Sequence, residues 1–366
     1  MNIRSNEPYW LINNGILNSY PSLQADADCD VLIVGAGITG ALMANACIKA
    51  GFRTLIIDKR EVANGSTSAT TAMLQYEIDV PLYQLAKLIG EIGAVASYKA
   101  CRDSIHTLGK IATEIKSDNG FMKKESLYFA SSSKDVKWLK TEFERRKKAG
   151  FEVCWLGQEQ IRKTYGLKSE GGILSKDGGS VDAFRLAHQL LNHNQNKGLE
   201  IYDKTELKTV KYFDDQVLVE TSTNAKIRAK KIIYCTGYES TQIIPEKIVK
   251  LKSTYAVVSE RMKNIPSAVK NTLFWNTAQP YLYMRTTADH RLLVGGEDEN
   301  FKNALLRDAL LGQKEEKLSK AIKKLMPEID FITDFTWSGT FGETKDGLPY
   351  IGPHPKFPNT YFCLGF

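Results

Sequence analysis

No apolar run in the 366-residue sequence is long enough to cross a membrane. A spanning helix needs about 18 to 20 consecutive apolar residues. The longest candidate, residues 38–50, is interrupted by Asn45 and Lys49. The N-terminal residues include Glu7 and two neighbouring asparagines, where a secretory signal peptide requires an unbroken apolar stretch. We therefore expect a cytoplasmic protein without a membrane span.

Cysteine and histidine are both scarce, and neither is spaced as a disulfide framework or a metal site requires. The six cysteines form no CxxC pair, so we expect reduced thiols, and a disulfide-reductase function is disfavoured. The five histidines show no ligand spacing, and the two that share a predicted helix, His188 and His193, are five residues apart. We interpret them as structural or solvent-facing, and we predict no metal site.

Charge of one sign is not concentrated anywhere in the chain. It has 49 Lys and Arg against 42 Asp and Glu, a formal net charge of +7. The densest basic run, residues 145–148, lies among acidic residues and is typical of an exposed helix face. We therefore expect no nucleic-acid partner. A hydrophobic content of 43% in a chain of this length instead indicates a globular protein of one large or two ordinary domains.

What the sequence does contain is a dinucleotide-binding pattern near its N-terminus. Residues 31–34 predict a buried parallel strand, a GxGxxG turn follows, and residues 41–50 predict a buried helix that ends at Gly51. Residues 53–57 predict a second strand with Asp58 at its tip. This β-α-β context distinguishes the motif from a chance match. The turn consists of Gly35, Ala36, Gly37, Ile38, Thr39 and Gly40.

Each residue type in the motif has a physical reason. Gly35 permits the tight turn, Gly37 lets a pyrophosphate approach the backbone, and Gly40 lets the helix and the strand pack closely. The phosphate charge then meets the free amides at the helix N-terminus. Asp58 can accept hydrogen bonds from the adenosine ribose, and its charge disfavours the 2′-phosphate of NADP. The motif therefore predicts NAD or FAD as the ligand.

Two further features favour FAD over NAD. A Ser/Thr-rich loop at residues 60–80 and a long helical stretch at 81–117 follow the motif, where NAD dehydrogenases usually continue with further β-α units. Residues 230–235 then predict a late buried strand that ends in Thr236 and Gly237, a pattern typical of flavin-dependent folds. An NAD-linked dehydrogenase is the alternative that these features argue against.

The sequence resembles the FAD-dependent D-amino-acid oxidase/glycine oxidase (DAO) superfamily over residues 30–366. Four blocks carry the resemblance: VLIVGAGITGA with Asp58, the stretch from Arg60 through GSTSATTAMLQ, IIYCTGY, and GETKDGLPYIG with NTYFCLGF. The first is common to many flavoproteins, whereas the second and fourth are more specific. The resemblance implies noncovalent FAD and a mixed α/β (α+β) fold. In that fold a Rossmann-like FAD-binding domain is interleaved with an antiparallel-sheet substrate domain.

The resemblance also implies a discontinuous FAD-binding domain, so we predict approximate boundaries for each part. Relatives continue past their last strand into a Gly-rich turn and a final helix, and we therefore expect the natural C-terminus to lie beyond Phe366. The predicted segments are 1–29 for an N-terminal arm, 30–80, 180–250 and 335–366 for the FAD-binding domain, and 81–179 and 251–334 for the substrate domain.

In relatives, the loop that matches residues 65–73 wraps the pyrophosphate and ribityl chain and passes beside the isoalloxazine ring. Small residues suit this role because backbone amides must reach the ligand, and hydroxyl groups add donors. Leu207 matches a position whose backbone contacts the adenine, and Gly347 and Leu348 match a turn near the flavin. Cys363 is the one cysteine that we consider for a covalent bond to the flavin. Our expectation remains noncovalent FAD. The further cofactor-binding residues that the resemblance implies are Lys59, Arg60, Gly65, Ser66, Thr67, Thr71, Ala72, Met73, Thr236 and Gly237.

The best candidates for substrate contacts lie in the sequence YLYMR. Strand alternation puts Tyr281, Tyr283 and Arg285 on one face, and in relatives the corresponding strand belongs to the sheet that roofs the flavin. Arg285 is suited to hold a substrate carboxylate in a bidentate pair, and the tyrosines are suited to wall the pocket. The alternative for Arg285 is a surface or ion-paired position. Arg291 is a second, weaker candidate.

The resemblance implies hydride transfer from the α-carbon of an amino acid or secondary amine to flavin N5, followed by hydrolysis of the imine. We assign no base, because an amine that binds neutral needs none. The electron acceptor is oxygen or another carrier. Sarcosine-oxidase-like relatives place a lysine on the strand that matches residues 291–295, and its absence here favours a dehydrogenase. Alternatives are a dehydrogenase of a hydroxy acid or polyol phosphate and a non-catalytic flavin-binding or electron-transfer subunit.

Overall fold

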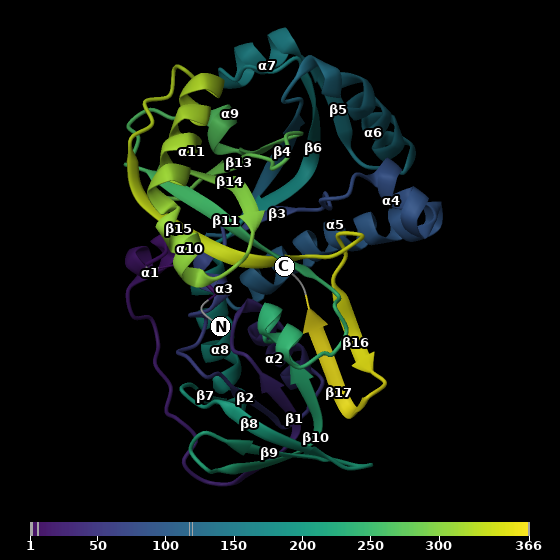
Figure 1. The fold of residues 1–366 in the computed structure, drawn as a ribbon, viewed down its shortest axis with the longest axis vertical. Helices are drawn as coiled ribbons and strands as arrows, with labels where there is room; N and C mark the ends of the chain where they lie inside the picture. Colours follow the sequence, from purple (N-terminus) through teal and green to yellow (C-terminus); the bar gives the residue numbers. More distant parts are fainter. Residues whose placement is uncertain (1–2, 6, 117, 119, 365–366) are drawn as a thin grey trace.

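The computed structural model describes residues 3–5, 7–116, 118 and 120–364. Two β-sheets occupy the lower and upper parts of the molecule as drawn in Figure 1. The chain crosses between the sheets repeatedly, so each sheet combines segments that are distant in the sequence. This interleaving brings the N-terminal glycine turn close to segments from the second half of the chain.

The first sheet has eight strands and a parallel centre. Its order is β16-β17-β10-β1-β2-β7, and the β8-β9 hairpin joins β10 through β9. The five strands from β17 to β7 run parallel, as in dinucleotide-binding folds, whereas β16, β9 and β8 pair antiparallel. The bounds are β1 Ala27–Val34, β2 Thr54–Ile57, β7 Glu200–Tyr202, β8 Leu207–Tyr212, β9 Val217–Thr221, β10 Lys226–Tyr234, β16 Tyr350–His354 and β17 Phe357–Leu364.

The two central strands are apolar on both faces because each face is covered. Ile33 and Ile56 pack toward α2 (Ile38–Lys49) and α8 (Ala183–Gln195), whereas Leu32 and Leu55 pack toward β9 and its hairpin. All four side chains are fully buried. Such continuous apolar runs are what a parallel sheet with two covered faces requires.

The second sheet has nine strands and is mostly antiparallel. Its order is β15-β11-β14-β13-β12-β4-β6-β3, with β5 paired to β6, and only the β12–β4 pair is parallel. One face packs against α11 (Leu311–Leu325), and the other face shares a core with the helices of the first sheet. The bounds are β3 Met73–Gln75, β4 Met122–Phe129, β5 Val153–Gly157, β6 Gly171–Ser180, β11 Lys250–Ser259, β12 Thr272–Asn276, β13 Tyr283–Thr286, β14 Leu292–Asn300 and β15 Thr333–Glu343.

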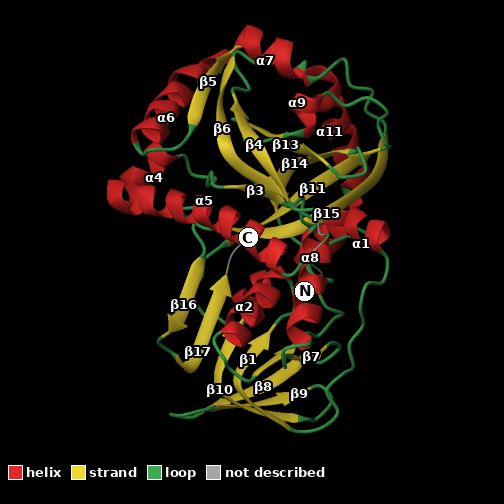
Figure 2. Cartoon of the chain, turned by 180° about the vertical axis from the view of Figure 1, so that it is seen from behind, coloured by secondary structure: helices red, strands yellow, loops and turns green. Residues whose placement is uncertain are grey.

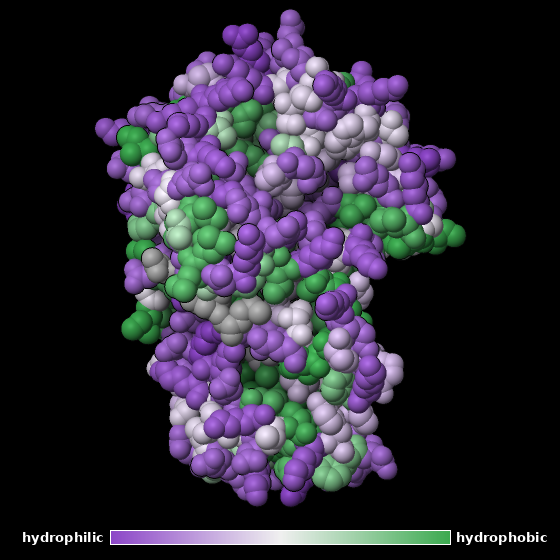
Figure 3. Space-filling view, in the orientation of Figure 1, coloured by the Kyte–Doolittle hydropathy of each residue, from purple (hydrophilic) through white to green (hydrophobic). Residues whose placement is uncertain are grey.

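The long helical stretch predicted at residues 81–117 is two helices, α4 (Leu82–Ile89) and α5 (Glu91–Glu114). Gly90 separates them with a φ of +84°, which other residues rarely adopt, whereas Gly93 lies inside α5. Apolar side chains are exposed on both sides of this break, among them Leu88 on α4 at 59% and Ile92 on α5 at 88%. Figure 3 shows hydrophobic surface at this end of α4, one of several such areas on this face. In Figure 2, α4 lies at the side of the molecule, and α5 runs from it toward the centre.

The sheet topology confirms the predicted mixed α/β fold with an antiparallel second sheet. The remaining helices cover the second sheet or connect the strands. The sequence-based domain boundaries remain predictions; β3 and β15 both pair within the second sheet. The remaining helices are α1 Tyr9–Asn14, α3 Ser66–Ala69, η1 Ser133–Asp135, α6 Val136–Lys148, α7 Gln158–Tyr165, η2 Gly237–Gln242, α9 Ser267–Lys270 and α10 Ala304–Ala309.

Candidate functional site

The GxGxxG turn joins β1 to α2 and touches the end of β10. A Cβ on Gly35 would lie 2.5 Å from the Cys235 carbonyl oxygen, and one on Gly40 would lie 1.9 Å from the Gly35 carbonyl oxygen. Gly35 also has a φ of +104°. Neither position has room for a side chain, so backbone packs on backbone. The first turn of α2, which starts at Ile38, keeps amides without a helical partner, as an anion-binding turn requires.

Asp58 lies beside this turn at the tip of β2. Its Oδ2 accepts a hydrogen bond from the Ala36 amide at 2.8 Å, and its Oδ1 accepts one from the Arg60 amide at 2.9 Å. The Thr205 amide donates to the Asp58 carbonyl oxygen at 2.7 Å, which brings the segment before Leu207 alongside. Desolvation by surrounding atoms raises the pKa of the Asp58 carboxyl, although the side chain is only half-buried.

Glu239 closes the same region from the opposite side. It lies in η2, which follows Thr236 and begins at Gly237, and its carboxylate accepts hydrogen bonds from Lys59 Nζ at 2.8 Å and Arg60 Nη2 at 2.9 Å. Burial alone raises the pKa of Glu239, but the hydrogen bonds from Arg60 and Lys59 hold it below its usual value. The ends of β2 and β10 are thereby tied together. Sequence reasoning missed Glu239, because no local pattern pairs residues 180 positions apart.

The Ser/Thr-rich loop folds directly over the glycine turn. Thr67 Oγ1 accepts a hydrogen bond from the Ile38 amide at 3.0 Å, and a Cβ on Gly37 would lie 2.9 Å from this hydroxyl oxygen. Ser68 donates to the Gly65 carbonyl oxygen at 2.9 Å, which stabilises the short helix α3, beginning at Ser66. The structure therefore brings the two predicted cofactor motifs together. After α3 the loop turns at Ala72, with a φ of +51°, and enters β3 at Met73.

Two buried tryptophans hold the same loop from its other side. Trp10 Nε1 donates to the Thr70 carbonyl oxygen at 2.6 Å, and Trp337 Nε1 donates to the Ala69 carbonyl oxygen at 2.8 Å. Trp10 comes from α1 near the N-terminus, whereas Trp337 comes from β15. The loop conformation is thus fixed by three regions of the chain. The sequence offered no signal for either tryptophan contact.

Tyr283 covers the end of the loop from the second sheet. A Cβ on its cross-strand partner Gly295 would lie 2.3 Å from the Tyr283 ring, so the ring lies flat over the glycine. The Tyr283 hydroxyl is 3.3 Å from Thr254 Oγ1, and the Thr71 hydroxyl is close enough to affect the pKa of Tyr283, which burial raises. Met284 points the opposite way into the core, so the predicted alternation is correct.

Tyr281 lies next to Tyr283 and further from the loop. We call these two residues the tyrosine wall. The Tyr281 hydroxyl donates to Asp79 Oδ1 at 3.2 Å, and the Tyr281 ring lies 5.6 Å from that of Tyr283. Asp79 is exposed, yet desolvation raises its pKa, as at Asp58. Asp298 on β14 has its Oδ1 buried without a hydrogen-bond partner among the described residues, and burial raises its pKa to about 6. The two aspartates were not predicted; they reach the wall from different segments.

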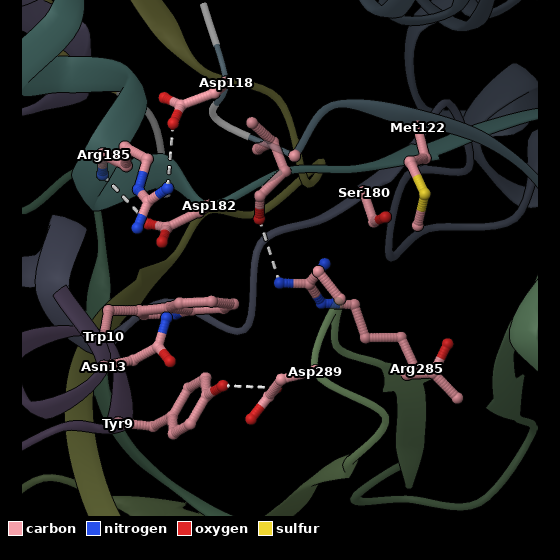
Figure 4. A pocket seen from close by; sticks show the side chains of 14 residues that line it. Tyr9, Trp10, Asn13, Asp118, Met122, Ser180, Asp182, Arg185, Arg285 and Asp289 are labelled. Carbon is pink, nitrogen blue, oxygen red and sulfur yellow. Dashed lines mark hydrogen bonds and ion pairs between the residues drawn. The ribbon is translucent and has the colours of Figure 1, made fainter.

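Arg285 shares the face of Tyr283 but lines a different recess. Its Nη2 donates to the Val181 carbonyl oxygen at 3.0 Å, and its guanidinium carbon lies 5.1 Å from the centre of the Trp10 ring. Figure 4 shows the Arg285 side chain reaching toward the Trp10 ring, and both line a cavity of about 180 Å³. The side chain is 3% exposed, and burial lowers its pKa to about 10. Neither Tyr281 nor Tyr283 lines this cavity.

The other predicted positions are also accounted for. Arg291 contacts the carboxylates of Asp289 and Asp334, so it is held by acids outside the tyrosine wall. Gly347 has a φ of +70°, and a Cβ there would lie 2.8 Å from Ile78 Cγ2, next to Asp79. Leu348 follows in the same turn, where its amide donates to Asp346 Oδ1 at 3.1 Å.

These residues fit a dinucleotide with a ring at one end. The glycine turn offers backbone amides and no side chains, as a pyrophosphate requires. Asp58 lies at one end of the loop, and Thr71 leads to the Tyr283 wall at the other. Among the described residues, no group of three or more His, Cys, Asp or Glu side chains could hold a metal ion. Across the same part of the chain, no helix has both the length and the apolarity needed to span a bilayer.

Comparison with known proteins gives a consistent result. The family model described as "FAD dependent oxidoreductase" (DAO) matches residues 30–366. Glycine oxidase of Bacillus licheniformis is 25% identical over 350 residues, which cover 92% of this chain and 87% of that enzyme. The YhfW protein of Bacillus subtilis (strain 168) is 24% identical over 352 residues. The match covers 95% of this chain but only 66% of YhfW, so that relative is longer.

Solved structures show the same fold. L-proline dehydrogenase from P. horikoshii has a TM-score of 0.76 at 17% identity, covering 94% of this chain and 89% of that chain. Glycine oxidase from Geobacillus kaustophilus has a TM-score of 0.75 at 20% identity, covering 93% and 89%. Sequence identities this low establish the fold alone, so the chemistry must be argued from the residues of the site.

Proposed function

Because the chain belongs to the FAD-dependent oxidoreductase (DAO) family, we propose that it oxidises an amine or amino acid at the carbon attached to nitrogen. FAD is the cofactor of this family, and we propose that it is held without a covalent bond. The glycine oxidase and L-proline dehydrogenase relatives act on substrates of this class by name. Cys363, the one candidate for covalent attachment, lies on β17 of the first sheet, apart from the tyrosine wall.

One observation carries the proposal: the same loop contacts both halves of the site. At its start Thr67 accepts a hydrogen bond from the Ile38 amide in the glycine turn. At its end Thr71 adjoins Tyr283 in the second sheet. A ligand bound by the turn and following this loop arrives under the tyrosine wall. That path suits a dinucleotide whose reactive ring must meet a small substrate.

The chain's own residues bind and orient the substrate in this proposal. When bound, FAD supplies an acceptor for the two electrons, taken from the substrate carbon as a hydride. The substrate carbon must be held about 3 to 3.5 Å from that acceptor. We assign the exclusion of water from this contact to Tyr283 and to two buried residues of the second sheet, Ala256 and Trp337. The substrate nitrogen must be neutral, because its lone pair forms the C=N bond as hydride leaves. The resulting imine takes up water and splits into a carbonyl compound and an amine or ammonia.

For reoxidation we propose a carrier other than oxygen. Leu293 is the central residue of the strand where some relatives place a lysine, and it is a fully buried hydrocarbon on the core shared with the first sheet. The provisional name of YhfW describes a Rieske iron–sulfur protein, which is a one-electron carrier. Mixing the reduced holoenzyme with air-saturated buffer tests this. We expect reoxidation much slower than turnover with an artificial acceptor.

An anionic alternative, a hydroxy acid or polyol phosphate, is less well supported. The carboxyl groups of Asp79 and Asp298 lie at the tyrosine wall, and they offer a phosphate no cationic partner. Arg285, the predicted carboxylate anchor, remains available only to a substrate that reaches the cavity beside Trp10. We keep that role as a proposal for amino-acid substrates.

The visible spectrum of the purified protein tests the main proposal. We expect flavin absorption after addition of FAD, and loss of that absorption when amines or amino acids are added without oxygen. A flavin spectrum that no amine or amino acid bleaches would favour a hydroxy acid or a non-catalytic role. A protein that takes up no FAD would contradict the site described above.

A further inference from the structure

The cavity of about 180 Å³ beside Trp10 lies between helix α1 and the second sheet. Tyr9 and Trp10 line it from α1, whereas Met122 and Arg285 line it from the second sheet (Figure 4). Its volume admits more than a single water molecule. The described residues that line it include none from the glycine turn or the tyrosine wall, so the cavity is separate from both.

Arg285 brings a buried positive charge to this cavity. Its side chain is 3% exposed, and its Nη2 donates to the Val181 carbonyl oxygen at 3.0 Å. Its Nε is buried without a hydrogen-bond partner among the described residues, and the same residues give the guanidinium no ion pair. A buried cation that lacks a counter-charge has a large free-energy cost, which a bound anion would offset.

A second buried cation lies close to the first. Lys124 on β4 is 3% exposed, and its Nζ donates to Thr286 Oγ1 at 3.3 Å and to the Lys270 carbonyl oxygen. Burial lowers the pKa of Lys124 to about 8, and repulsion from Arg285 contributes to this shift. Thr286 follows Arg285 on β13 and also lines the cavity. Both cations are therefore held by neutral acceptors, which leaves the positive charge of this region without a matching acid.

The three acids that line the cavity already have partners. Asp118 pairs with Arg185 Nη1 at 3.3 Å, and Asp289 pairs with Arg291 Nε at 2.8 Å. Asp182 accepts a hydrogen bond from the Arg185 amide at 2.9 Å and so caps α8. Asp182 is close enough to favour the charged form of the buried guanidinium, but its contacts within the described chain include no ion pair to that group. A ligand with a single negative charge fits such surroundings better than a doubly charged phosphate, which these acids would repel.

We propose that this cavity binds the carboxylate of a small organic acid, with Arg285 as its anchor and the Trp10 ring beside the body of the acid. The two oxygens of a carboxylate match the guanidinium fork, and they can accept from the unpartnered Nε–H and a neighbouring N–H. Two sources share this chemistry: the carboxylate of an amino-acid substrate, and a separate acid that is not oxidised. The site itself does not depend on the proposed amine oxidation.

The first test measures binding to the FAD-loaded protein by calorimetry, with propanoate and propanamide as probes. The two molecules have nearly the same shape and differ in charge. We expect propanoate to bind wild type at least about 10-fold more tightly than propanamide, a comparison that needs no variant. Arg285→Gln should weaken propanoate binding about 10- to 100-fold, the effect of losing a charge-assisted pair, whereas Arg285→Lys should retain part of the affinity.

Arg261→Gln is the matched control. Arg261 is 70% exposed, pairs with Asp289 at 3.3 Å and does not line the cavity. The variant removes the same charge near the cavity without touching the anchor, so propanoate affinity should stay within about twofold of wild type. Retained FAD absorption shows that each variant is folded.

A second test identifies the source of the carboxylate by comparing L-proline with pyrrolidine and glycine with methylamine as substrates. If the substrate's own carboxylate occupies the cavity, each amino acid should have the higher kcat/KM of its pair, and Arg285→Gln should remove the difference. If a separate acid occupies it, Arg285→Gln should leave these values unchanged, and propanoate should not raise the KM of any of the four. Either result supports the carboxylate site.

The remaining outcomes separate this inference from the proposed function. If propanoate binds wild type no more tightly than propanamide, or binds Arg285→Gln as tightly as wild type, the carboxylate site is wrong and amine oxidation stands. If propanoate binds as expected but no amine or amino acid bleaches the flavin, amine oxidation is wrong and the carboxylate site remains.

Discussion

Replacing Arg146 with methionine should destabilise the protein strongly. Arg146 lies on α6 with its side chain fully buried. Its Nε donates to Glu142 Oε1 at 2.7 Å, and its Nη1 donates to Glu77 Oε1 at 3.2 Å. Its guanidinium carbon lies within 5.8 Å of the ring centres of three tyrosines, Tyr76, Tyr98 and Tyr128. Methionine keeps much of the volume but leaves two buried carboxylates without a cation.

The expected loss of stability follows from the two buried carboxylates that would lose their cation. Removing one partner of a buried ion pair costs about 3 to 5 kcal/mol. The free energy of unfolding, measured by urea denaturation at pH 8, should fall by about this amount in Arg146→Met. Arg145→Met is the control on the same helix, because Arg145 is 45% exposed and pairs with Glu91 at 3.4 Å. A surface pair of this kind is worth at most about 1 kcal/mol.

The pH dependence distinguishes charge from packing. Burial already raises the pKa of Glu77 to about 6 beside Arg146. Without the arginine, the pKa of the Glu77 carboxyl in the folded state should rise further above its unfolded value. Stability should then increase as pH falls through that raised value. We expect the deficit of Arg146→Met relative to wild type to shrink between pH 8 and pH 5.5. A deficit below 1 kcal/mol, or one that is equal at both pH values, would refute this reasoning.

Three further predictions concern other positions. Gly40→Ala should abolish FAD binding, measured by flavin retention, because the new Cβ would lie 1.9 Å from the Gly35 carbonyl oxygen. Thr67→Val should weaken FAD binding about fivefold in a fluorescence titration, because the Ile38 amide loses its acceptor, a loss of about 1 kcal/mol. His188 is buried, and burial lowers its pKa to about 4, so the unfolded state binds more protons below pH 6.5. The free energy of unfolding should fall by about 3 kcal/mol as pH drops from 6.5 to 4. In His188→Leu, this part of the pH dependence should be absent.

Sequence reasoning located the nucleotide end of the site well because its signals are local. The turn from Gly35 to Gly40 and the acid Asp58 lie within 24 consecutive residues, and their spacing reflects backbone geometry that the contacts above explain. The break at Gly90 could not be located in this way, since Gly93 is the same residue type and lies within a helix. Local sequence did not separate them, because the choice depends on how α4 and α5 pack.

The substrate end was predictable only in part. Alternation correctly put Tyr281, Tyr283 and Arg285 on one face, but it could not show that Arg285 turns toward Trp10 and the Val181 carbonyl. That outcome depends on an N-terminal residue 275 positions away. Asp79 was equally invisible, because its partner Tyr281 is 202 residues distant. Contacts at such separations leave no periodicity in a single sequence.

The contacts between residues 3–5 and β15 have a consequence for how the chain acquires its native form. The Thr340 amide donates to the Ile3 carbonyl oxygen at 2.9 Å, and the Ser338 amide donates to Ser5 Oγ at 2.7 Å across a separation of 333 residues. During synthesis, residues 3–5 emerge long before β15 and must wait for nearly all of the described chain before they can dock. Pairings of such high contact order form slowly. The cofactor loop, which Trp10 and Trp337 hold from both ends of the described chain, should therefore be among the last parts to become ordered, and uptake of FAD should report the end of folding.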